Sequence, residues 1–313
     1  MSSYVVALDV GGTSMKGGLV SESGEVLLTE RRPTPRADGP DVVVGVIREF
    51  IADLAARGGG GPAGVGLAVP GLVTADTALY SANIGWRDVP ATAFTGLDVP
   101  VMLGHDVRTG GLAESVLGAG RGMTDFLFLP IGTGIAGAMI VHGEPYGGAE
   151  GWGGEIGHIP VFPDGEPCAC GQFGCLETYA SAASVGRRYS QRSGVAGAKA
   201  EEVVSSDDPL AIEVWDEAVE ALSLALATYT LLLDPSMIVL GGGLAEAGPA
   251  LFDPVRTRLV KRLAFREAPP LVGSALGVNA GMLGAALLGW RAAGRGELGA
   301  SWTMDVRPTP GVS

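Results

Sequence analysis

The sequence of 313 residues is poor in basic side chains, in aromatic side chains and in cysteines. It has 21 Lys and Arg against 34 Asp and Glu, a net charge of −13, and no cluster of basic residues. Nucleic-acid-binding proteins normally carry a basic face, so we expect no nucleic-acid partner. Aromatic residues make up only 6 % of the chain, whereas glycine occurs 51 times, which indicates many tight turns and close backbone approaches.

Long apolar runs are also lacking. The first ten residues, MSSYVVALDV, have neither the basic start nor the long apolar core of a signal peptide. The longest apolar run, 126–141, is interrupted by Pro130 and by glycines and is shorter than a membrane span. Together with the cysteine usage, this predicts a cytoplasmic protein without a membrane partner. The chain length and a hydrophobic content of 47 % indicate two domains or lobes with sizeable cores.

All three cysteines lie in one segment, residues 154–177. Cys168, Cys170 and Cys175 follow the pattern C-x-C-x4-C, and His158 lies ten residues upstream of the first. Three thiols and one imidazole form a Cys3His set that suits tetrahedral Zn²⁺. The alternatives are a disulfide with a spare thiol or three unrelated buried cysteines, but a C-x-C pair bridges poorly. Because four protein ligands leave no open position, we expect a structural zinc ion.

Three glycine-rich turns follow apolar segments that we predict as strands at 4–9, 124–130 and 237–240. The turns are Gly11-Gly12-Thr13, Gly132-Thr133-Gly134 and Gly241-Gly242-Gly243. The second turn leads into another strand at 135–141, as the first does, so the two units form a weak internal repeat. Such turns can bind phosphate through backbone N–H groups, and Asp9 before the first can orient hydrated Mg²⁺. Glycine turns often only close hairpins, so each turn by itself is a moderate signal of phosphate binding.

Asp106 follows a predicted strand at 99–103, at the point where a helix begins. A carboxylate at a strand end is well placed for chemistry in an open α/β sheet. Capping the helix is the more common role of Asp in this setting, and the local sequence leaves both roles open. Trp86, in a loop that follows Asn83, is interpreted as a core residue. Helices are predicted at 41–57, 180–192, 209–233, 249–265 and 280–293.

Taken together, these motifs resemble the ROK family of sugar kinases and related repressors, within the actin-like ATPase superfamily. The resemblance runs from Tyr4 to Trp290, and glucokinases look most similar. Its carriers are ALDVGGTSMKGGLV, GLAVPGLV, SANIGW, HDVRTGGLAE, IGTGIAG, GGEIGH with CACGQFGCLE, and IVLGGGLAEAG. The resemblance implies an α/β fold of two lobes with ribonuclease-H-like topology, a structural zinc site, and sugar and ATP in the cleft between the lobes.

The resemblance also guides the expected domains. We expect residues 1–105 to form a small N-terminal lobe, completed by the C-terminal helix near 280–293. Residues 106–293 are then the large lobe, which carries the zinc-binding loop 155–177. Residues 294–313 are predicted to be a loose tail, because they contain Gly and Pro and no apolar period. Helices rich in small residues are compatible with a homo-oligomer, a dimer or a tetramer.

Individual roles follow from the same resemblance at matched positions. Asp106 matches the general base that takes the proton from the attacking sugar hydroxyl. The sugar-binding positions are Gly71, Asn83, His105, Asp106, Glu155, His158 and Glu177. The zinc ligands are His158, Cys168, Cys170 and Cys175. The environment of the nucleotide phosphates and Mg²⁺ is formed by Asp9, Gly11, Gly12, Thr13, Gly132, Thr133, Gly134, Gly241, Gly242 and Gly243.

One departure from the family pattern is His105, which stands where Asn is usual. An imidazole can change which sugar fits or make binding pH-sensitive. The implied function is an ATP-dependent kinase that converts glucose to glucose 6-phosphate in glycolysis. Alternatives are a kinase for another hexose or an N-acetylhexosamine, and a catalytically weak sugar-sensing regulator. Repressors of this type carry a helix-turn-helix ahead of the kinase-like part, for which a strand beginning at Tyr4 leaves no room. The sequence leaves ATP and polyphosphate open as phosphoryl donors.

Overall fold

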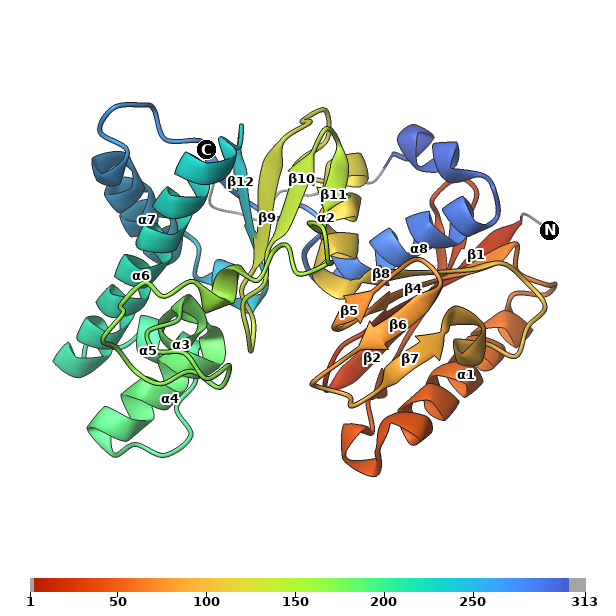
Figure 1. The fold of residues 1–313 in the computed structure, drawn as a ribbon, viewed down its shortest axis with the longest axis horizontal. Helices are drawn as coiled ribbons and strands as arrows, with labels where there is room; N and C mark the ends of the chain where they lie inside the picture. Colours follow the sequence, from red (N-terminus) through yellow and green to blue (C-terminus); the bar gives the residue numbers. More distant parts are fainter. Residues whose placement is uncertain (1–2, 304–313) are drawn as a thin grey trace. The chain divides into compact units, whose positions relative to one another are not determined.

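The computed structural model describes residues 3–303, and Figure 1 shows how the chain is folded. The described residues divide into two compact units, each with its own hydrophobic core. The first unit comprises residues 3–122, 144–153 and 278–303, and the second comprises residues 123–143 and 154–277. In the described part of the chain, no helix is both long enough and apolar enough to span a bilayer.

The first sheet has the strand order β3-β2-β1-β4-β8. Its strands are β1 (Tyr4–Val10), β2 (Ser14–Ser21), β3 (Val26–Pro33), β4 (Gly64–Val69) and β8 (Val101–His105). Strands β1, β2 and β3 are antiparallel neighbours, whereas β1, β4 and β8 run parallel. The carboxyl ends of the three parallel strands therefore lie at one edge, where Asp9, Ala68 and Gly104 are neighbours in register.

Helices α1 (Pro40–Arg57) and α8 (Ala280–Ala292) cover opposite faces of this sheet (Figure 1). Side chains alternate along a strand, so Val6 and Leu8 of β1 join the core under α1, while Asp9 faces α8. Helix α8 lies very close to the sheet. A Cβ atom on Gly66 of β4 would be only 1.8 Å from the carbonyl oxygen of Ala285, so glycine is required there.

A small three-stranded sheet in the first unit was not predicted. Its strands are β5 (Leu72–Val73), β6 (Thr77–Tyr80) and β7 (Arg87–Pro90), paired antiparallel in the order β5-β6-β7. Each is four residues or shorter, which is too little for a periodic pattern. Trp86 lies just before β7, is 1 % exposed, and packs edge-on against Phe94 of the 3₁₀ helix η2 (Ala91–Phe94). Its interpretation as a core residue is confirmed.

The second sheet has the order β11-β10-β9-β12-β13. Its strands are β9 (Phe126–Pro130), β10 (Ala138–Val141), β11 (Glu144–Tyr146), β12 (Ile238–Gly241) and β13 (Leu271–Gly273). Strands β9 and β10 are antiparallel, and β9, β12 and β13 are parallel. Numbered from the first strand of each sheet, both sheets have the order 3-2-1-4-5. The internal repeat predicted from the two glycine–threonine turns is therefore confirmed.

Helices of the second unit pack around the core formed by β9 and β12. They are α3 (Leu176–Ala180), α4 (Ala182–Ser193), α5 (Ala200–Val204), α6 (Pro209–Leu233) and α7 (Pro249–Arg262), with 3₁₀ helices η3 (Ile156–His158) and η4 (Gly243–Ala247). Helix α6 has the predicted bounds. Asp208 caps its N-terminus by accepting the Leu210 N–H at 3.1 Å, and Pro209 occupies its first turn.

The division into units differs from the predicted lobes in two respects. Helix α2 (Asp106–Leu117) and residues 144–153, which the sequence assigned to the second lobe, belong to the first compact unit, as α8 does. The lobe boundary after His105 stays a prediction.

The predicted loose tail is wrong for its described part. Residues 296–301 form the 3₁₀ helix η6, and Trp302 is fully buried. The Trp302 indole N–H donates to the Glu22 carbonyl at 2.8 Å, and the Arg121 guanidinium donates to the Trp302 carbonyl at 3.0 Å. One large side chain anchors this segment, so it shows no apolar period. Residues 304–313 lie outside the described part of the chain.

Candidate active site and metal centre

Asp106 is the first residue of α2, immediately after β8. The N-cap is His105, whose Nδ1 accepts the Arg108 N–H at 3.4 Å. Of the two roles that the sequence left open for Asp106, the cap of α2 is thus taken by His105. Its Oδ1 accepts the N–H of its neighbour Val107 at 2.8 Å and lies 3.2 Å from His105 Nδ1, and 30 % of its side chain is exposed. The carboxylate thus lies partly buried at the carboxyl end of β8.

The pKa values of Asp106 and Asp9 are both raised. Burial raises the pKa of Asp106 to about 6, against the opposing effects of the Val107 N–H and the Arg108 charge. Burial and, to a smaller extent, the negative charge of Asp106 raise the pKa of Asp9 to about 7. Lys16 and Arg31 partly offset this rise. A carboxylate whose pKa lies near neutrality is suited to accept a proton from a bound hydroxyl group.

Two residues beside Asp9, Lys16 and Gly281, were not predicted. Lys16 is the cross-strand partner of Asp9 in the β1–β2 hairpin, and its ammonium group donates to Asn279 Oδ1. Burial lowers the pKa of Lys16, as does the nearby Arg31 charge. A Cβ atom on Gly281 would lie 2.3 Å from the Asp9 carboxylate, so that carboxylate rests against the start of α8. Pairing across the predicted hairpin was the one sequence signal for Lys16.

The first glycine turn is held by β3 and the residue that follows it. The Gly11 N–H donates to the Ser14 carbonyl at 3.0 Å, which closes the turn. Thr34 holds it from outside, because its hydroxyl donates to the Gly11 carbonyl at 2.7 Å and its N–H to the Thr13 carbonyl at 3.0 Å. Gly12 is partly exposed and the Thr13 side chain is exposed. The turn is therefore held in place by hydrogen bonds, while Gly12 and Thr13 remain accessible to a ligand.

Gly71 and Asn83, predicted to lie in loops that line the sugar site, also belong to the first unit. Gly71 has a φ of 96°, and a Cβ atom there would lie 2.1 Å from the Tyr80 carbonyl oxygen. Glycine is therefore required for the backbone path, whatever else the loop does. Asn83 is exposed.

In the second unit, the second and third glycine turns meet at one cavity of about 600 Å³. Gly242 has a φ of 73°, and a Cβ atom there would lie 2.4 Å from the Ile131 carbonyl oxygen, so the turns touch through glycine. Gly132 and Gly243 face open space, since a Cβ atom on either would meet nothing within 4 Å. The cavity is lined by Thr133, Ala182, Ala183, Ala198, Lys199, Ala200, Glu201, Val204, Gly243, Leu244, Glu246 and Ala247.

The sequence identified Thr133 and Gly243 in this lining but not Lys199, Glu201 or Glu246. Lys199 and Glu201 come from a segment without a glycine motif, whereas Glu246 lies within IVLGGGLAEAG but was assigned no role. Gly241 lies apart from the cavity lining. A Cβ atom there would lie 3.0 Å from the Phe128 ring, so its role in the structure is close packing of β12.

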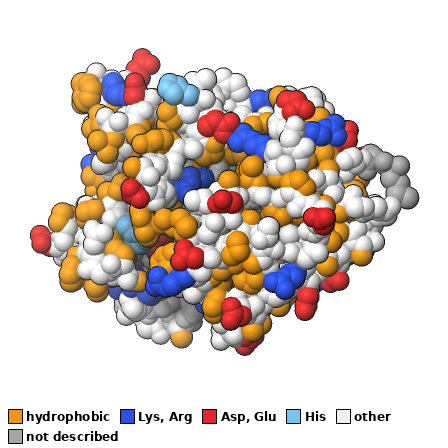
Figure 2. Space-filling view, turned by 45° about the vertical axis from the view of Figure 1, so that its right-hand side comes forward, with side chains coloured by type: hydrophobic (Ala, Val, Ile, Leu, Met, Phe, Trp, Pro, Cys, Tyr) orange, Lys and Arg blue, Asp and Glu red, His pale blue; other side chains and the backbone are white. Residues whose placement is uncertain are grey.

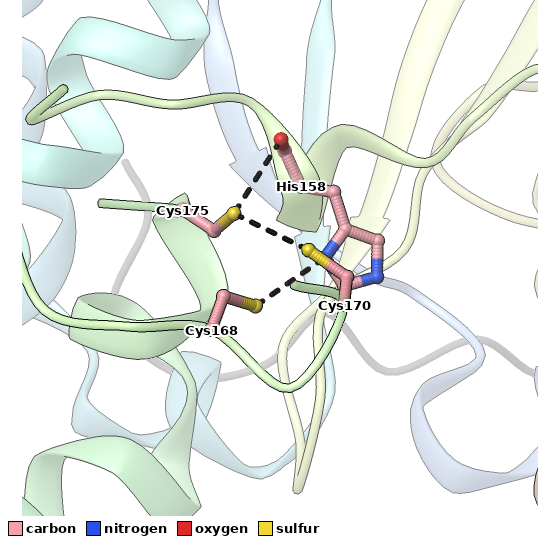
Figure 3. Close-up of side chains that lie close together, drawn as sticks. All are labelled: His158, Cys168, Cys170 and Cys175. Carbon is pink, nitrogen blue, oxygen red and sulfur yellow. Dashed lines mark hydrogen bonds between the residues drawn. The ribbon is translucent and has the colours of Figure 1, made fainter. Parts of the chain in front are cut away.

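The four predicted zinc ligands converge in the second unit (Figure 3). His158 Nδ1 lies 3.7 Å from Cys168 Sγ, and the Sγ atoms of Cys170 and Cys175 are 3.7 Å apart. All four ligand atoms lie within 4.8 Å of one another. Zn–S bonds of about 2.3 Å in a tetrahedron put sulfur atoms about 3.8 Å apart, so the donor set fits Zn²⁺. The disulfide alternative is wrong, because all three cysteines are free.

The second ring nitrogen of His158 faces Glu155. His158 Nε2 lies 3.9 Å from Glu155 Oε2, and the Glu155 side chain is 42 % exposed. Glu177 is held differently, because its Oε2 accepts the Ile135 N–H at 2.7 Å. Of the sugar-binding positions predicted in this unit, the structure thus brings His158 and Glu155 together. Glu177 contacts the backbone beside the second glycine turn.

Comparison with known proteins identifies the family. Residues 5–291 match the sequence profile of the ROK family. The chain belongs to the ROK family. It is 35 % identical to a glucokinase of Thermotoga maritima over 90 % of this chain and 96 % of that protein. It is 32 % identical to a glucokinase of Halalkalibacterium halodurans over 92 % of this chain and 94 % of that protein.

A solved structure supports the same assignment. The ROK family glucokinase from Streptomyces griseus, in complex with glucose and AMPPNP, superimposes with a TM-score of 0.80. It is 29 % identical, and the match covers 92 % of this chain and 100 % of that one. The α/β fold class of the ROK kinases, predicted from the sequence, is confirmed.

The surface of this ROK protein carries charges of both signs. On the face drawn in Figure 2, basic side chains lie among acidic and apolar ones rather than in a separate field. Many of the described arginines are paired with carboxylates, for example Arg188 with Glu166 at 2.7 Å and Arg291 with Glu144 at 2.8 Å. This face therefore carries no separate basic field despite the many arginines in the chain.

Proposed function

We propose that this ROK protein is an ATP-dependent sugar kinase that converts glucose to glucose 6-phosphate. The observation that carries the proposal is the Asp106 carboxylate at the carboxyl end of β8, with its pKa raised to about 6. The glucokinases of similar sequence and the glucokinase solved with glucose and AMPPNP support the choice of glucose and ATP.

In the proposed reaction, Asp106 accepts the proton of the sugar 6-hydroxyl group. The oxygen then forms a bond to the γ-phosphorus of ATP while the bond from that phosphorus to the β–γ bridging oxygen breaks, and ADP leaves. Phosphoryl transfer needs mainly positioning and charge neutralisation. Asp106 contributes the proton acceptor, and the raised pKa keeps the proton affinity of this carboxylate high while it remains ionised above about pH 6.

Asp9 and Lys16 are the residues proposed to meet the phosphates and the metal ion in the first unit. A carboxylate is the ligand type that Mg²⁺ prefers, and Asp9 sits beside the first glycine turn, so the donor set fits. Mg²⁺ bound with ATP would neutralise negative charge on the phosphates. Lys16, paired across the hairpin with Asp9, supplies a fixed positive charge at the same strand end.

We propose the cavity of about 600 Å³ in the second unit as the site of the nucleoside part of ATP. Its lining is largely apolar and small, with N–H groups of two glycine turns at one side, which suits a flat base followed by phosphates. Glu155, His158 and Glu177 of the same unit are proposed to bind sugar hydroxyl groups. His158 can do so through Nε2, because Nδ1 faces the thiols.

Zinc is proposed to be structural. His158, Cys168, Cys170 and Cys175 would hold Zn²⁺ with all four positions filled, so the ion would fix this loop rather than take part in the reaction. Cysteines kept reduced for a metal are typical of the cytoplasm, where we propose that the enzyme acts in sugar metabolism. A homo-oligomer stays a prediction.

A coupled kinase assay tests the proposal. Hexoses and N-acetylhexosamines are each offered with ATP or polyphosphate, and glucose with ATP should give the highest kcat/KM. Asp106→Asn should lower kcat by a factor of about 10² or more and leave glucose binding largely intact. Near-normal turnover in this variant would mean that the base lies elsewhere. His105→Asn, which keeps a cap for α2, should shift relative rates across the sugars; unchanged relative rates would remove His105 from sugar selection.

A further inference from the structure

The second glycine turn rests on the zinc-bearing block, residues 154–177, through close backbone contacts. The Gly137 N–H donates to the Gly154 carbonyl at 2.7 Å. A Cβ atom on Gly157 would lie 2.2 Å from the Ile135 carbonyl oxygen, and one on Gly134 would lie 2.6 Å from Glu177 Oε2. Such approaches require glycine on one side of each contact. The segment 131–137 and the block are therefore packed as one body inside the second unit.

One of these contacts is made by a charged side chain. Glu177 lies in the first turn of α3, two residues after Cys175, and its Oε2 accepts the Ile135 N–H at 2.7 Å. Hydrogen bonds to an ionised acceptor are stronger than those between neutral groups. The turn is also tied to α4, because the Ala182 N–H donates to the Gly132 carbonyl at 2.9 Å. Two neighbouring helices thus hold the backbone on both sides of Thr133.

We propose that Glu177 is a positioning residue for the nucleotide-binding turn Gly132–Gly134, and that it couples nucleotide binding to sugar binding. The inference rests on the proposed function. One carboxylate has two acceptor oxygens: Oε2 holds the Ile135 N–H, and Oε1 is the second acceptor through which Glu177 meets the sugar. A sugar that orders this carboxylate also orders the turn.

Such coupling is reciprocal, because a ligand that favours one arrangement of Glu177 favours the other ligand that uses the same arrangement. Glucose should therefore tighten the binding of a nucleotide, and the nucleotide should tighten the binding of glucose by the same factor. A residue that only contacts sugar would change sugar affinity alone. A residue that only supports the zinc site would change metal content and stability.

Three variants separate these roles. Glu177→Asp shortens the side chain and removes its reach to the Ile135 N–H, whereas Glu177→Gln keeps an oxygen that can accept this bond. Gly134→Ala adds a Cβ atom 2.6 Å from Glu177 Oε2 and displaces the carboxylate without replacing any residue proposed to bind sugar or zinc. Gly134 has no positive φ, so alanine is compatible with its backbone. Glu267→Gln, an exposed position in the same unit, is the matched control.

The measurement is calorimetric binding of a non-hydrolysable ATP analogue to the full-length protein, without and with glucose, together with zinc content and Tm. Without glucose, Glu177→Asp and Gly134→Ala should weaken nucleotide binding about tenfold, the loss expected for a hydrogen bond to a charged group. Glu177→Gln should lose less, and Glu267→Gln should match wild type. The factor by which glucose tightens nucleotide binding should fall toward 1 in Glu177→Asp and Gly134→Ala.

Unchanged nucleotide affinity in Glu177→Asp, with a loss of glucose affinity alone, would overturn the inference. If Glu177→Asp loses zinc or unfolds, Gly134→Ala is the deciding variant. Wild-type nucleotide affinity in Gly134→Ala would then overturn the inference. Failure of the proposed function has a different signature, because wild-type protein would then bind the nucleotide analogue yet phosphorylate no hexose. Wild-type protein that binds no nucleotide would overturn both.

Discussion

Replacing Asp106 by Asn should stabilise the folded protein at neutral pH while it abolishes phosphorylation. Burial raises the pKa of this carboxyl from 3.8 to about 6, so the folded state binds its proton more tightly than the unfolded state does. Stability linked to this proton is fully present below pH 3.8 and is lost as the pH rises through about 6. Above that pH, wild-type protein carries the cost of an ionised, poorly hydrated carboxylate.

The size of this cost follows from the shift. A change from 3.8 to about 6 corresponds to at most about 3 kcal/mol of unfolding free energy. Asn resembles the protonated carboxyl in charge, and its oxygen can still accept the Val107 N–H that Asp106 Oδ1 accepts at 2.8 Å. Loss of the Asp106 charge in the variant should also lower the pKa of Asp9, which that charge raises, so that Asp9 ionises at lower cost. We therefore expect most of the gain above pH 7 and almost none at pH 4.

Thermal unfolding of wild type and Asp106→Asn from pH 4 to pH 8 measures the effect. The two Tm values should coincide near pH 4 and diverge as the pH rises, by about 2–4 °C for each kcal/mol gained. Asp98→Asn, at an exposed position of the same unit, should show no such divergence. An Asp106→Asn variant that is no more stable than wild type at pH 8 would refute the claim that Asp106 is costly to ionise.

Three further predictions concern the reaction, the metal centre and the C-terminal segment. For the reaction, kcat/KM should rise with pH up to about 6 to 7 and then level off, because these are the apparent pKa values of the Asp9–Asp106 pair. A flat profile from pH 5 to 8 would contradict a carboxylate base. Purified protein should contain one zinc ion per chain by metal analysis, and replacing the buried ligand in Cys175→Ser should release it and lower Tm; an unchanged zinc content would exclude this thiol as a ligand. Trp302→Ala should cost about 3–5 kcal/mol, because a fully buried indole and its hydrogen bond to Glu22 are lost; urea unfolding that gives wild-type stability would remove the anchoring role.

Elements with local boundary signals were predictable from the sequence. Helix α6 has the predicted bounds because Asp208 and Pro209 begin it and Asp234, in the left-handed conformation, with Pro235 ends it. The Cys3His cluster was predictable because its ligands lie close in sequence. The short strands β5, β6 and β7 were not, since two to four residues carry no period and pairing with neighbours decides their conformation.

The candidate site was predictable as a set of motifs but not as a set of contacts. The contact between Glu177 and Ile135 joins residues 42 positions apart, and only the packed structure brings them together. The same holds for Gly281, which carries no motif yet leaves the space in which the Asp9 carboxylate lies. His105 was marked by the sequence as unusual, but its position as the cap of α2 follows only from the helix geometry.

During synthesis from the N-terminus, the first unit cannot be completed until α8 has been made. Strands β1 and β4 are synthesised early, but α8, which lies directly on Gly66 and covers their second face, begins only at Ala280. Until then a face of that sheet is uncovered, whereas residues 123–277 already contain nearly everything that the second unit needs. We therefore expect the first unit, although synthesised first, to complete its folding last, and a chain truncated before α8 to expose one face of this sheet.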